Sequence, residues 1–259
     1  HTYLLSDGQR MTLRHQDHRS YRIDRQAEIV SDTHRVELVS SRADVLTSYR
    51  QMIGERFPPE PHAPAWVKDM ILLEVYPKYY EGGFKGIAAR LPAYREIGFN
   101  TLYLMPHWLG GYSPIDPSAI DSAYGTEEDL KELVRTAHQL GMHVLFDMVI
   151  HGFNKKSPLP VEHPEYFIHD EQGNLVLHRT WQSITCDWAS PAYQQYMSDL
   201  VIHDVEKYDI DGYRVDAATY KSPNWDPRIP YPAYKSGTAA PELLGKMLQS
   251  LRTRKPEAI

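Results

Sequence analysis

Two charged residues of opposite sign, Arg214 and Asp216, lie two positions apart in the segment Asp211–Ala218. Residues with this spacing face the same side of a β-strand. A neighbouring guanidinium favours the ionised form of a carboxylic acid, and an ionised carboxylate can act as a nucleophile. A structural Arg–Asp pair at the end of a strand would have the same spacing, so the spacing alone leaves both interpretations open.

The surrounding pattern predicts a parallel α/β fold that would position this pair. Four apolar, β-rich runs predict strands, namely Met70–Tyr76, Thr101–Met105, His143–Ile150 and Ile210–Val215. Between and after them, helical spacing predicts helices at residues 84–97, 126–141, 190–205 and 241–251. Such alternation indicates right-handed crossovers, and parallel α/β folds place their reactive groups at the carboxyl ends of the strands.

Local signals mark the ends of these helices. Thr126, with Asp129 three residues later, predicts a capping box, and Gly141 predicts the end of the same helix. Ser190 followed by Pro191 predicts the start of another helix. Pro92 should kink or interrupt the first helix, because it lacks the N–H that an interior position requires.

Composition excludes several classes of function. The chain has 259 residues, is 42% hydrophobic and carries a net charge of −6, which indicates a folded protein and disfavours a nucleic-acid partner. No apolar run approaches 18 residues, so no membrane span or membrane partner is expected. The single cysteine, Cys186, cannot form an internal disulfide, and the cellular compartment stays undetermined.

The chain divides into three predicted parts. Residues 1–50 alternate polar and apolar positions at Arg10–Leu13, Tyr21–Asp24 and Arg35–Val39, which predicts part of a small β domain. Residues 51–65 contain four prolines and predict a linker. Residues 66–259 hold the α/β pattern, with residues 152–189 forming an excursion too long for a plain loop.

Four segments in this last part resemble the α-amylase superfamily, glycoside hydrolase family 13. Asp211–Ala218 resembles the family's "GFRVDAA" segment on the fourth strand, and Asp147–His151 resembles the "DVVxNH" segment that closes the third. Gly111–Thr126 is similar to "GYDVTDY…IDPxYGT", and Glu74–Pro77 is similar to the first-strand "YEVFP". The resemblance implies the amino-terminal half of a (β/α)8 barrel, with residues 152–189 as the family's domain B after the third strand.

The resemblance also implies roles for site residues. Asp216 matches the family's nucleophile and Arg214 the arginine that holds it. Tyr112 would stack on the sugar in the reactive subsite, although a tyrosine that only packs is the alternative. Asp147 would order the hydrogen bonds of the site, and His151 is a further candidate for substrate binding. Trp181 and Trp188 are either core residues of domain B or outer sugar-binding platforms.

Departures from the family pattern concern its calcium ion. The family's "NH" reads His151–Gly152 here, and its "KH" reads Thr219–Tyr220, so among the ligands only Asp187 stays in place. Calcium requires an oxygen-rich site, so we predict that this calcium is absent and that the chain has no metal cofactor. Histidine pairs such as His15 with His18, or His163 with His169, are better explained as solvated or hydrogen-bonded side chains than as metal ligands.

These features predict a retaining glycoside hydrolase or transglycosylase that acts on the α-glucosidic linkages of α-glucans or maltooligosaccharides. A retaining mechanism requires a second carboxyl group as acid and base. The resemblance places that acid, a Glu, at the end of a fifth strand, which would begin just beyond Ile259. We therefore expect a fragment that lacks its acid and is inactive alone. The alternative is a non-catalytic carbohydrate-binding or interaction protein with half of this fold.

Overall fold

A four-stranded parallel sheet forms the centre of the protein. The structure, a computed structural model, describes residues 2–6, 8, 11–15, 41–56, 63–219 and 221–259. The sheet has the strand order β10-β7-β4-β3. Its strands are β3 (Leu72–Val75), β4 (Thr101–Leu104), β7 (His143–Val149) and β10 (Gly212–Asp216). All three pairings are parallel, which confirms the four predicted strands and their direction.

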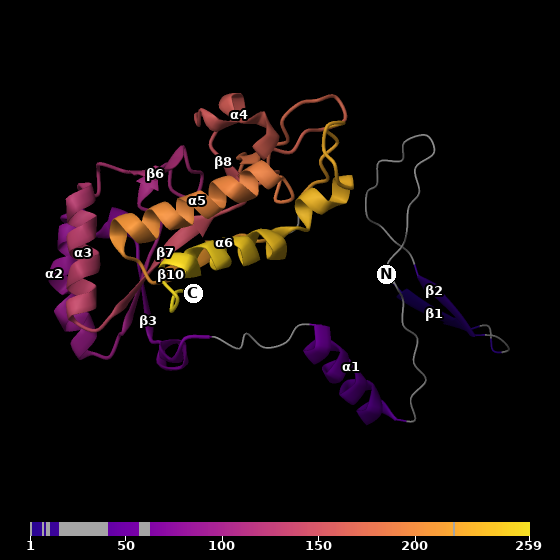
Figure 1. Ribbon diagram of the computed structural model, residues 1–259, viewed down its shortest axis with the longest axis horizontal. Coiled ribbons are helices and arrows are strands. Elements are labelled where there is room, and N and C mark those ends of the chain that lie inside the picture. The colour runs from indigo at the N-terminus through magenta and orange to yellow at the C-terminus, as the bar shows by residue number, and fades with distance from the viewer. Residues whose placement is uncertain (1, 7, 9–10, 16–40, 57–62, 220) are drawn as a thin grey trace.

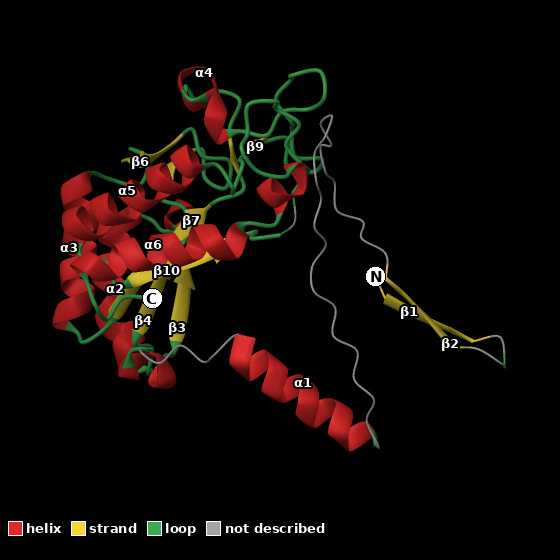
Figure 2. Ribbon diagram, turned by 45° about the vertical axis from the view of Figure 1, so that its right-hand side comes forward, coloured by secondary structure: helices red, strands yellow, loops and turns green. Residues whose placement is uncertain are grey.

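The helices form one layer over this sheet (Figures 1 and 2). They are α2 (Gly83–Glu96), α3 (Glu127–Gln139), α5 (Pro191–Tyr208) and α6 (Ala240–Arg254). Each packs against the next, α2 on α3, α3 on α5 and α5 on α6, so the helices follow the order of their strands. The most extended apolar core lies between this layer and the sheet.

The ends of two helices follow the predicted signals. The Thr126 hydroxyl accepts a hydrogen bond from the Asp129 N–H, and the Asp129 carboxylate accepts one from the Thr126 N–H, which confirms the capping box. The Ser190 hydroxyl likewise accepts from the Tyr193 N–H at the start of α5. In contrast, α2 is not interrupted at Pro92. Its buried stripe, which includes Leu91, packs into the core and offsets the hydrogen bond that the proline cannot make.

The two faces of the sheet differ in chemistry. Alternate residues such as Leu102, Val144 and Phe146 are fully buried and belong to the core beneath the helices. The residues between them point the other way, and these include Tyr103 and Asp147, which hydrogen-bond to each other. The chain thus places apolar side chains toward the helices and its polar, aromatic side chains on the opposite face.

The edge of β10 is extended by the last residue of the chain. The Tyr213 N–H donates to the Ile259 carbonyl at 2.9 Å, and the Ile259 N–H donates to the Asp211 carbonyl at 3.1 Å. This is the pattern of two parallel strands, with Ile259 beside Gly212. Gly212 has φ +150°, and a Cβ there would lie 2.1 Å from the Ile259 carbonyl oxygen, so the close approach requires glycine.

Residues 152–189 lie between β7 and α5. They contain the short antiparallel pair β8 (Gly152–Phe153) and β9 (Ile184–Thr185) and the single turn α4 (Leu159–Glu162). A second antiparallel pair, β5 (Trp108–Leu109) with β6 (Asp116–Ile120), follows β4. Both additions therefore leave the sheet at the carboxyl ends of its strands.

The amino-terminal part differs from its prediction. An antiparallel hairpin, β1 (Thr2–Ser6) with β2 (Met11–His15), agrees with a β-rich start. However, α1 (Arg42–Arg56) is a helix that crosses the predicted boundary between residues 50 and 51, so β structure up to residue 50 is wrong for residues 42–50. The Ser41 hydroxyl caps this helix by accepting from the Asp44 N–H. Tyr21–Asp24, Arg35–Val39 and most of the proline-rich stretch lie outside the described residues.

No helix in the described part of the chain is long and apolar enough to cross a membrane.

Candidate active site

Arg214 and Asp216 form an ion pair on the polar face of β10. Arg214 Nη1 lies 2.7 Å from Asp216 Oδ1, as expected for two residues that project from the same side of one strand. The Asp216 side chain is 21% exposed and that of Arg214 is 43% exposed, so both can be reached from solvent. Burial alone would lower the pKa of Arg214, but the negative charges of Asp147 and Asp216 raise it, and the guanidinium stays charged.

Asp147 joins this pair from the neighbouring strand β7. The register places Asp147 directly opposite Arg214, and Arg214 Nη1 lies 3.3 Å from Asp147 Oδ1. Asp147 is fully buried, and this burial raises its carboxyl pKa, while hydrogen bonds and the Arg214 charge act in the opposite direction. Arg214 therefore bridges a buried carboxylate and an accessible one.

Two tyrosines complete the hydrogen-bonded group. The Tyr103 hydroxyl, from β4, donates to Asp147 Oδ2 at 2.6 Å and lies 3.2 Å from the Tyr112 hydroxyl. Burial and the nearby Asp147 raise the pKa of both phenols, so both remain protonated donors. Tyr103 was not among the predicted site residues. Its position on the same face of the sheet as Asp147 is the signal that could have identified it.

His151 lies in a buried aromatic cluster, and a hydrogen bond with the backbone of Tyr112 connects its ring to this group. It is 1% exposed, and its ring packs against the Trp181 indole with centroids 4.6 Å apart. Lys221 is also buried, and its ammonium lies 5.0 Å from the centre of the Trp181 ring. Burial first, and then the charge of Lys221, lowers the pKa of His151 to about 3, so the imidazole is neutral. The structure thus brings Tyr112, Asp147, Arg214 and Asp216 together, and leaves His151 beneath an indole.

The two tryptophans of the excursion differ in environment. Trp188 is 1% exposed and donates its indole N–H to the Ile150 carbonyl, so it is a core residue. Trp181 is 45% exposed, and the ring of His178 also stacks on it, with ring centroids 4.0 Å apart. Of the two, only Trp181 offers an accessible aromatic surface.

His163 and His169 each have a neighbouring carboxylate. His163 lies 3.2 Å from Glu165 and stacks on Tyr166, and His169 Nδ1 lies 3.8 Å from Asp226. Within the described ranges, no group of three or more His, Cys, Asp or Glu side chains could hold a metal ion. His18 lies outside those ranges.

Comparison with known proteins identifies the family. The sequence matches the family described as "Alpha amylase, catalytic domain" over residues 30–159, which is half of the chain. The chain belongs to the α-amylase family. This is a family of glycosidases, glycoside hydrolase family 13, with a TIM-barrel fold, and solved structures similar to this chain include alpha-amylases and a trehalose-6-phosphate hydrolase. The family match and the four-stranded parallel sheet together identify an α/β catalytic domain.

Several members of the α-amylase family are similar to this chain. An intracellular maltogenic amylase from Bacillus subtilis is 23% identical, with 60% of this chain matched to 34% of that protein. A probable oligo-1,6-glucosidase 3 from the same species is 27% identical, with 65% matched to 38%. The crystal structure of an alpha-amylase from Lactobacillus plantarum has a TM-score of 0.60 at 26% identity, covering 74% of this chain and 44% of that one. The chain thus spans between a third and a half of the length of these relatives.

Proposed function

We propose that this chain is the nucleophile-bearing part of a retaining enzyme that acts on α-glucosidic linkages of α-glucans or maltooligosaccharides. The observation that carries the proposal is the accessible Asp216 carboxylate, held 2.7 Å from Arg214 at the carboxyl end of β10. Relatives named as a maltogenic amylase, an oligo-1,6-glucosidase and a 1,4-alpha-glucan-branching enzyme support the substrate class.

In this mechanism Asp216 attacks the anomeric carbon of the sugar. A bond forms between a carboxylate oxygen and that carbon while the glycosidic C–O bond breaks, and the departing oxygen takes a proton from a general acid. Water then attacks the anomeric carbon and displaces Asp216, and its proton passes to the same residue that acted as the acid, which is now a base. In a transfer reaction the hydroxyl of another sugar takes the place of the water. Arg214 fixes the orientation of the Asp216 carboxylate through their ion pair, and the buried Asp147 in turn fixes Arg214.

The general acid would come from a further strand. Ile259 already forms the hydrogen bonds of a parallel strand beside Gly212. A strand continuing from this point would draw level with Asp216 about four residues later, and adjacent strands lie roughly 4.8 Å apart. That spacing suits the roughly 5–5.5 Å between the two carboxyl groups of a retaining glycosidase. We therefore place the acid outside these 259 residues and expect the present sheet to be half of a barrel, with residues 152–189 as domain B.

Sugar binding would use the aromatic residues of the polar face. Tyr112 is placed beside the Asp147 network by its hydroxyl, 3.2 Å from that of Tyr103, so its ring can meet the C–H face of a glucose unit near Asp216. His151 would reach substrate only if the Trp181 indole above it moved, because His151 is 1% exposed. Tyr112 is therefore the stronger of the two candidates.

The test uses a polypeptide that contains these residues and cleaves an α-1,4 or α-1,6 glucoside. Asp216→Asn should lower kcat/KM by at least about a thousandfold, because the amide is a far weaker nucleophile. Asp199→Asn is the matched control, because Asp199 is exposed on α5 and its carboxylate accepts a hydrogen bond from Gln195 of the same helix. The first product should retain the α configuration by NMR. Full activity in Asp216→Asn, or an inverted product, would refute the proposal.

A further inference from the structure

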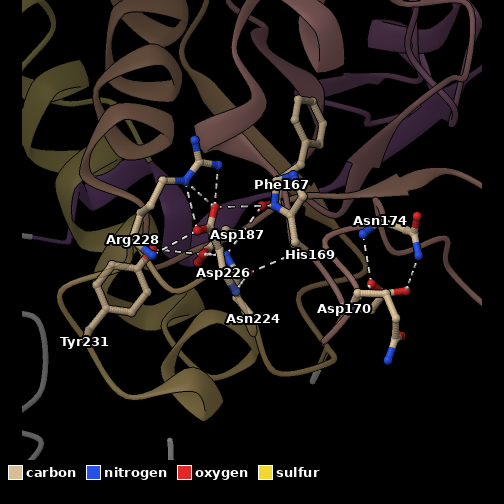
Figure 3. Close-up of polar contacts among 10 residues, drawn as sticks. Phe167, His169, Asp170, Asn174, Asp187, Asn224, Asp226, Arg228 and Tyr231 are labelled. Carbon is tan, nitrogen blue, oxygen red and sulfur yellow. Dashed lines mark hydrogen bonds and ion pairs between the residues drawn. The ribbon is translucent and has the colours of Figure 1, made fainter. Parts of the chain in front are cut away.

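The carboxylate of Asp187 is fully buried just before α5 and is surrounded by uncharged donors (Figure 3). Its Oδ2 accepts hydrogen bonds from Asn224 Nδ2 at 2.6 Å and from the Tyr231 hydroxyl at 2.8 Å. Its Oδ1 accepts from the Ala189 N–H at 2.9 Å. Both carboxylate oxygens are thus engaged by N–H or O–H groups of this chain.

This arrangement does not fit the calcium ion that the family resemblance implies at Asp187. Calcium takes six to eight oxygen ligands, whereas the groups around Asp187 direct hydrogen atoms, not lone pairs, toward its oxygens. No cluster of acidic or histidine side chains suited to a metal occurs in the described part of the chain.

The two side-chain donors come from a different segment, residues 221–237, which follows the nucleophile strand. Asn224 connects this segment to the excursion in two directions. Its Nδ2 donates to Asp187, and its Oδ1 accepts from the His169 N–H at 3.0 Å. The Trp225 N–H donates to the His169 carbonyl at 2.9 Å, which adds a backbone link beside the side-chain links.

An ion pair covers the outer side of these bonds. Arg228 Nη2 lies 2.6 Å from Asp226 Oδ2, and Arg228 Nε lies 2.9 Å from Asp226 Oδ1 (Figure 3). The Asp226 N–H donates to Asn224 Oδ1 at 3.0 Å, so the pair is connected to Asn224 through the backbone. His169 Nδ1 faces the same carboxylate at 3.8 Å.

Residues 221–237 begin five positions after Asp216, and backbone hydrogen bonds hold both ends of this segment. The Lys221 N–H donates to the Gly237 carbonyl, and the Trp188 N–H donates to the Ser236 carbonyl, so both ends of the segment are tied down. Ala217, directly after Asp216, has φ +50°, a left-handed conformation that is strained for alanine. Such strain persists only where the surrounding structure holds the chain in place.

We propose that three side chains take the place of a calcium ion at this position and hold two segments of the fold together without a metal. They are Asp187, Asn224 and Tyr231, and we call them the Asp187 junction. The junction fastens residues 221–237 to the excursion and thereby positions the chain that follows Asp216. The three side chains are positioning residues, and the protein does not bind calcium there. The proposal concerns the architecture of this chain and stands whether or not the proposed reaction is correct.

The first experiment tests the absence of metal in the 259-residue chain. Thermal unfolding is compared in a chelator and in millimolar calcium, and terbium is added as a luminescent probe that Trp188 would sensitise. A calcium site at 100 times its Kd would add about 2.7 kcal/mol and raise Tm by at least about 5 °C. We expect a change below about 1 °C and no saturable terbium emission. A calcium-dependent rise in Tm that Asp187→Asn abolishes would overturn the proposal.

The second experiment tests the junction itself by amide hydrogen exchange. Asp187→Asn places an N–H₂ group against donors, and the gentler Tyr231→Phe removes one donor. We expect exchange at the His169 and Trp225 amides to accelerate at least about tenfold in both variants, because these N–H groups join the two segments. The control is Asp170→Asn, since Asp170 bonds within its own turn to Gln172 and Asn174.

Accelerated exchange at both amides in Tyr231→Phe, with the control unchanged, supports the junction even if Asp187→Asn fails to fold. Unchanged exchange at both amides in a folded Tyr231→Phe overturns it. Acceleration in the Asp170→Asn control to the same extent would also overturn it, because the effect would then not come from the contacts with residues 221–237.

Discussion

Asp211, at the start of β10, should make stability depend on pH in a defined range. Its carboxylate accepts hydrogen bonds from the Val144 N–H at 2.7 Å and from His138 Nε2 at 2.9 Å, and it lies 2.9 Å from Lys255 Nζ. The side chain is 9% exposed. Burial alone would raise its pKa, but these three partners together lower it from 3.8 to about 2.

The magnitude follows from the difference between the folded and unfolded pKa values. A shift of about 1.8 units is worth about 2.4 kcal/mol at 1.36 kcal/mol per unit. Because the folded pKa is the lower one, this stabilisation is fully present above about pH 4. It is lost as the pH falls through about 2, where the folded carboxylate takes up its proton. The same residue aligns β10 with β7, and so places Arg214 opposite Asp147.

The assay is urea unfolding of wild type and Asp211→Asn, followed by circular dichroism at several pH values. At pH 7 the variant should lose about 2 kcal/mol, which corresponds to a Tm lower by roughly 4–8 °C. The difference should shrink toward zero as the pH approaches 2, since the wild-type carboxylate is then protonated too. Asp199→Asn should change stability by less than about 0.5 kcal/mol at every pH. A difference that stays constant from pH 7 to pH 2 would refute the reasoning.

Three further substitutions test other parts of the structure. Gly212→Ala should lower the free energy of unfolding by at least about 2 kcal/mol in chemical unfolding, because the added Cβ would meet the Ile259 carbonyl. Its control is Gly245→Ala, which should be neutral or stabilising because Gly245 lies in a helix with open space around it. Tyr103→Phe should cost about 1–3 kcal/mol in the same assay by leaving the buried carboxylate of β7 without its 2.6 Å donor, and a loss below 0.5 kcal/mol would contradict this. Trp181→Ala should weaken maltooligosaccharide binding about tenfold in calorimetry if its exposed indole stacks on sugar, and an unchanged Kd would exclude that role.

The regular elements of the sheet and helix layers could be predicted because their signals are local. Apolar runs at β4 and β7, the capping box at Thr126 and the Ser190 cap each depend on residues a few positions apart. The helix α1 was missed because the prediction for residues 1–50 came from three alternating stretches that all precede α1, although the apolar residues of α1 itself have helical spacing. Its Ser41 cap and its run of good helix-forming residues decide the outcome in the structure.

The candidate site was predictable only in part, for a related reason. The spacing of Arg214 and Asp216 within one strand is visible in the sequence, whereas Tyr103 in the apolar strand β4 has the appearance of a core residue. The partners of Asp187 come 37 and 44 residues later in the chain, in a segment with no periodic pattern. Contacts of that kind depend on the path of the loops, which no local signal determines.

The most direct test of the central claim is chemical trapping at Asp216. A fluorinated maltosyl fluoride has a leaving group that departs without protonation, so formation of the covalent intermediate does not require the general acid. After incubation of an active polypeptide that contains this chain, peptide mass spectrometry should locate one glycosyl group on Asp216, and Asp216→Asn should remain unlabelled. A glycosyl group on another carboxylate, or an unlabelled wild type that still turns over maltooligosaccharides, would contradict the assignment of Asp216 as the nucleophile.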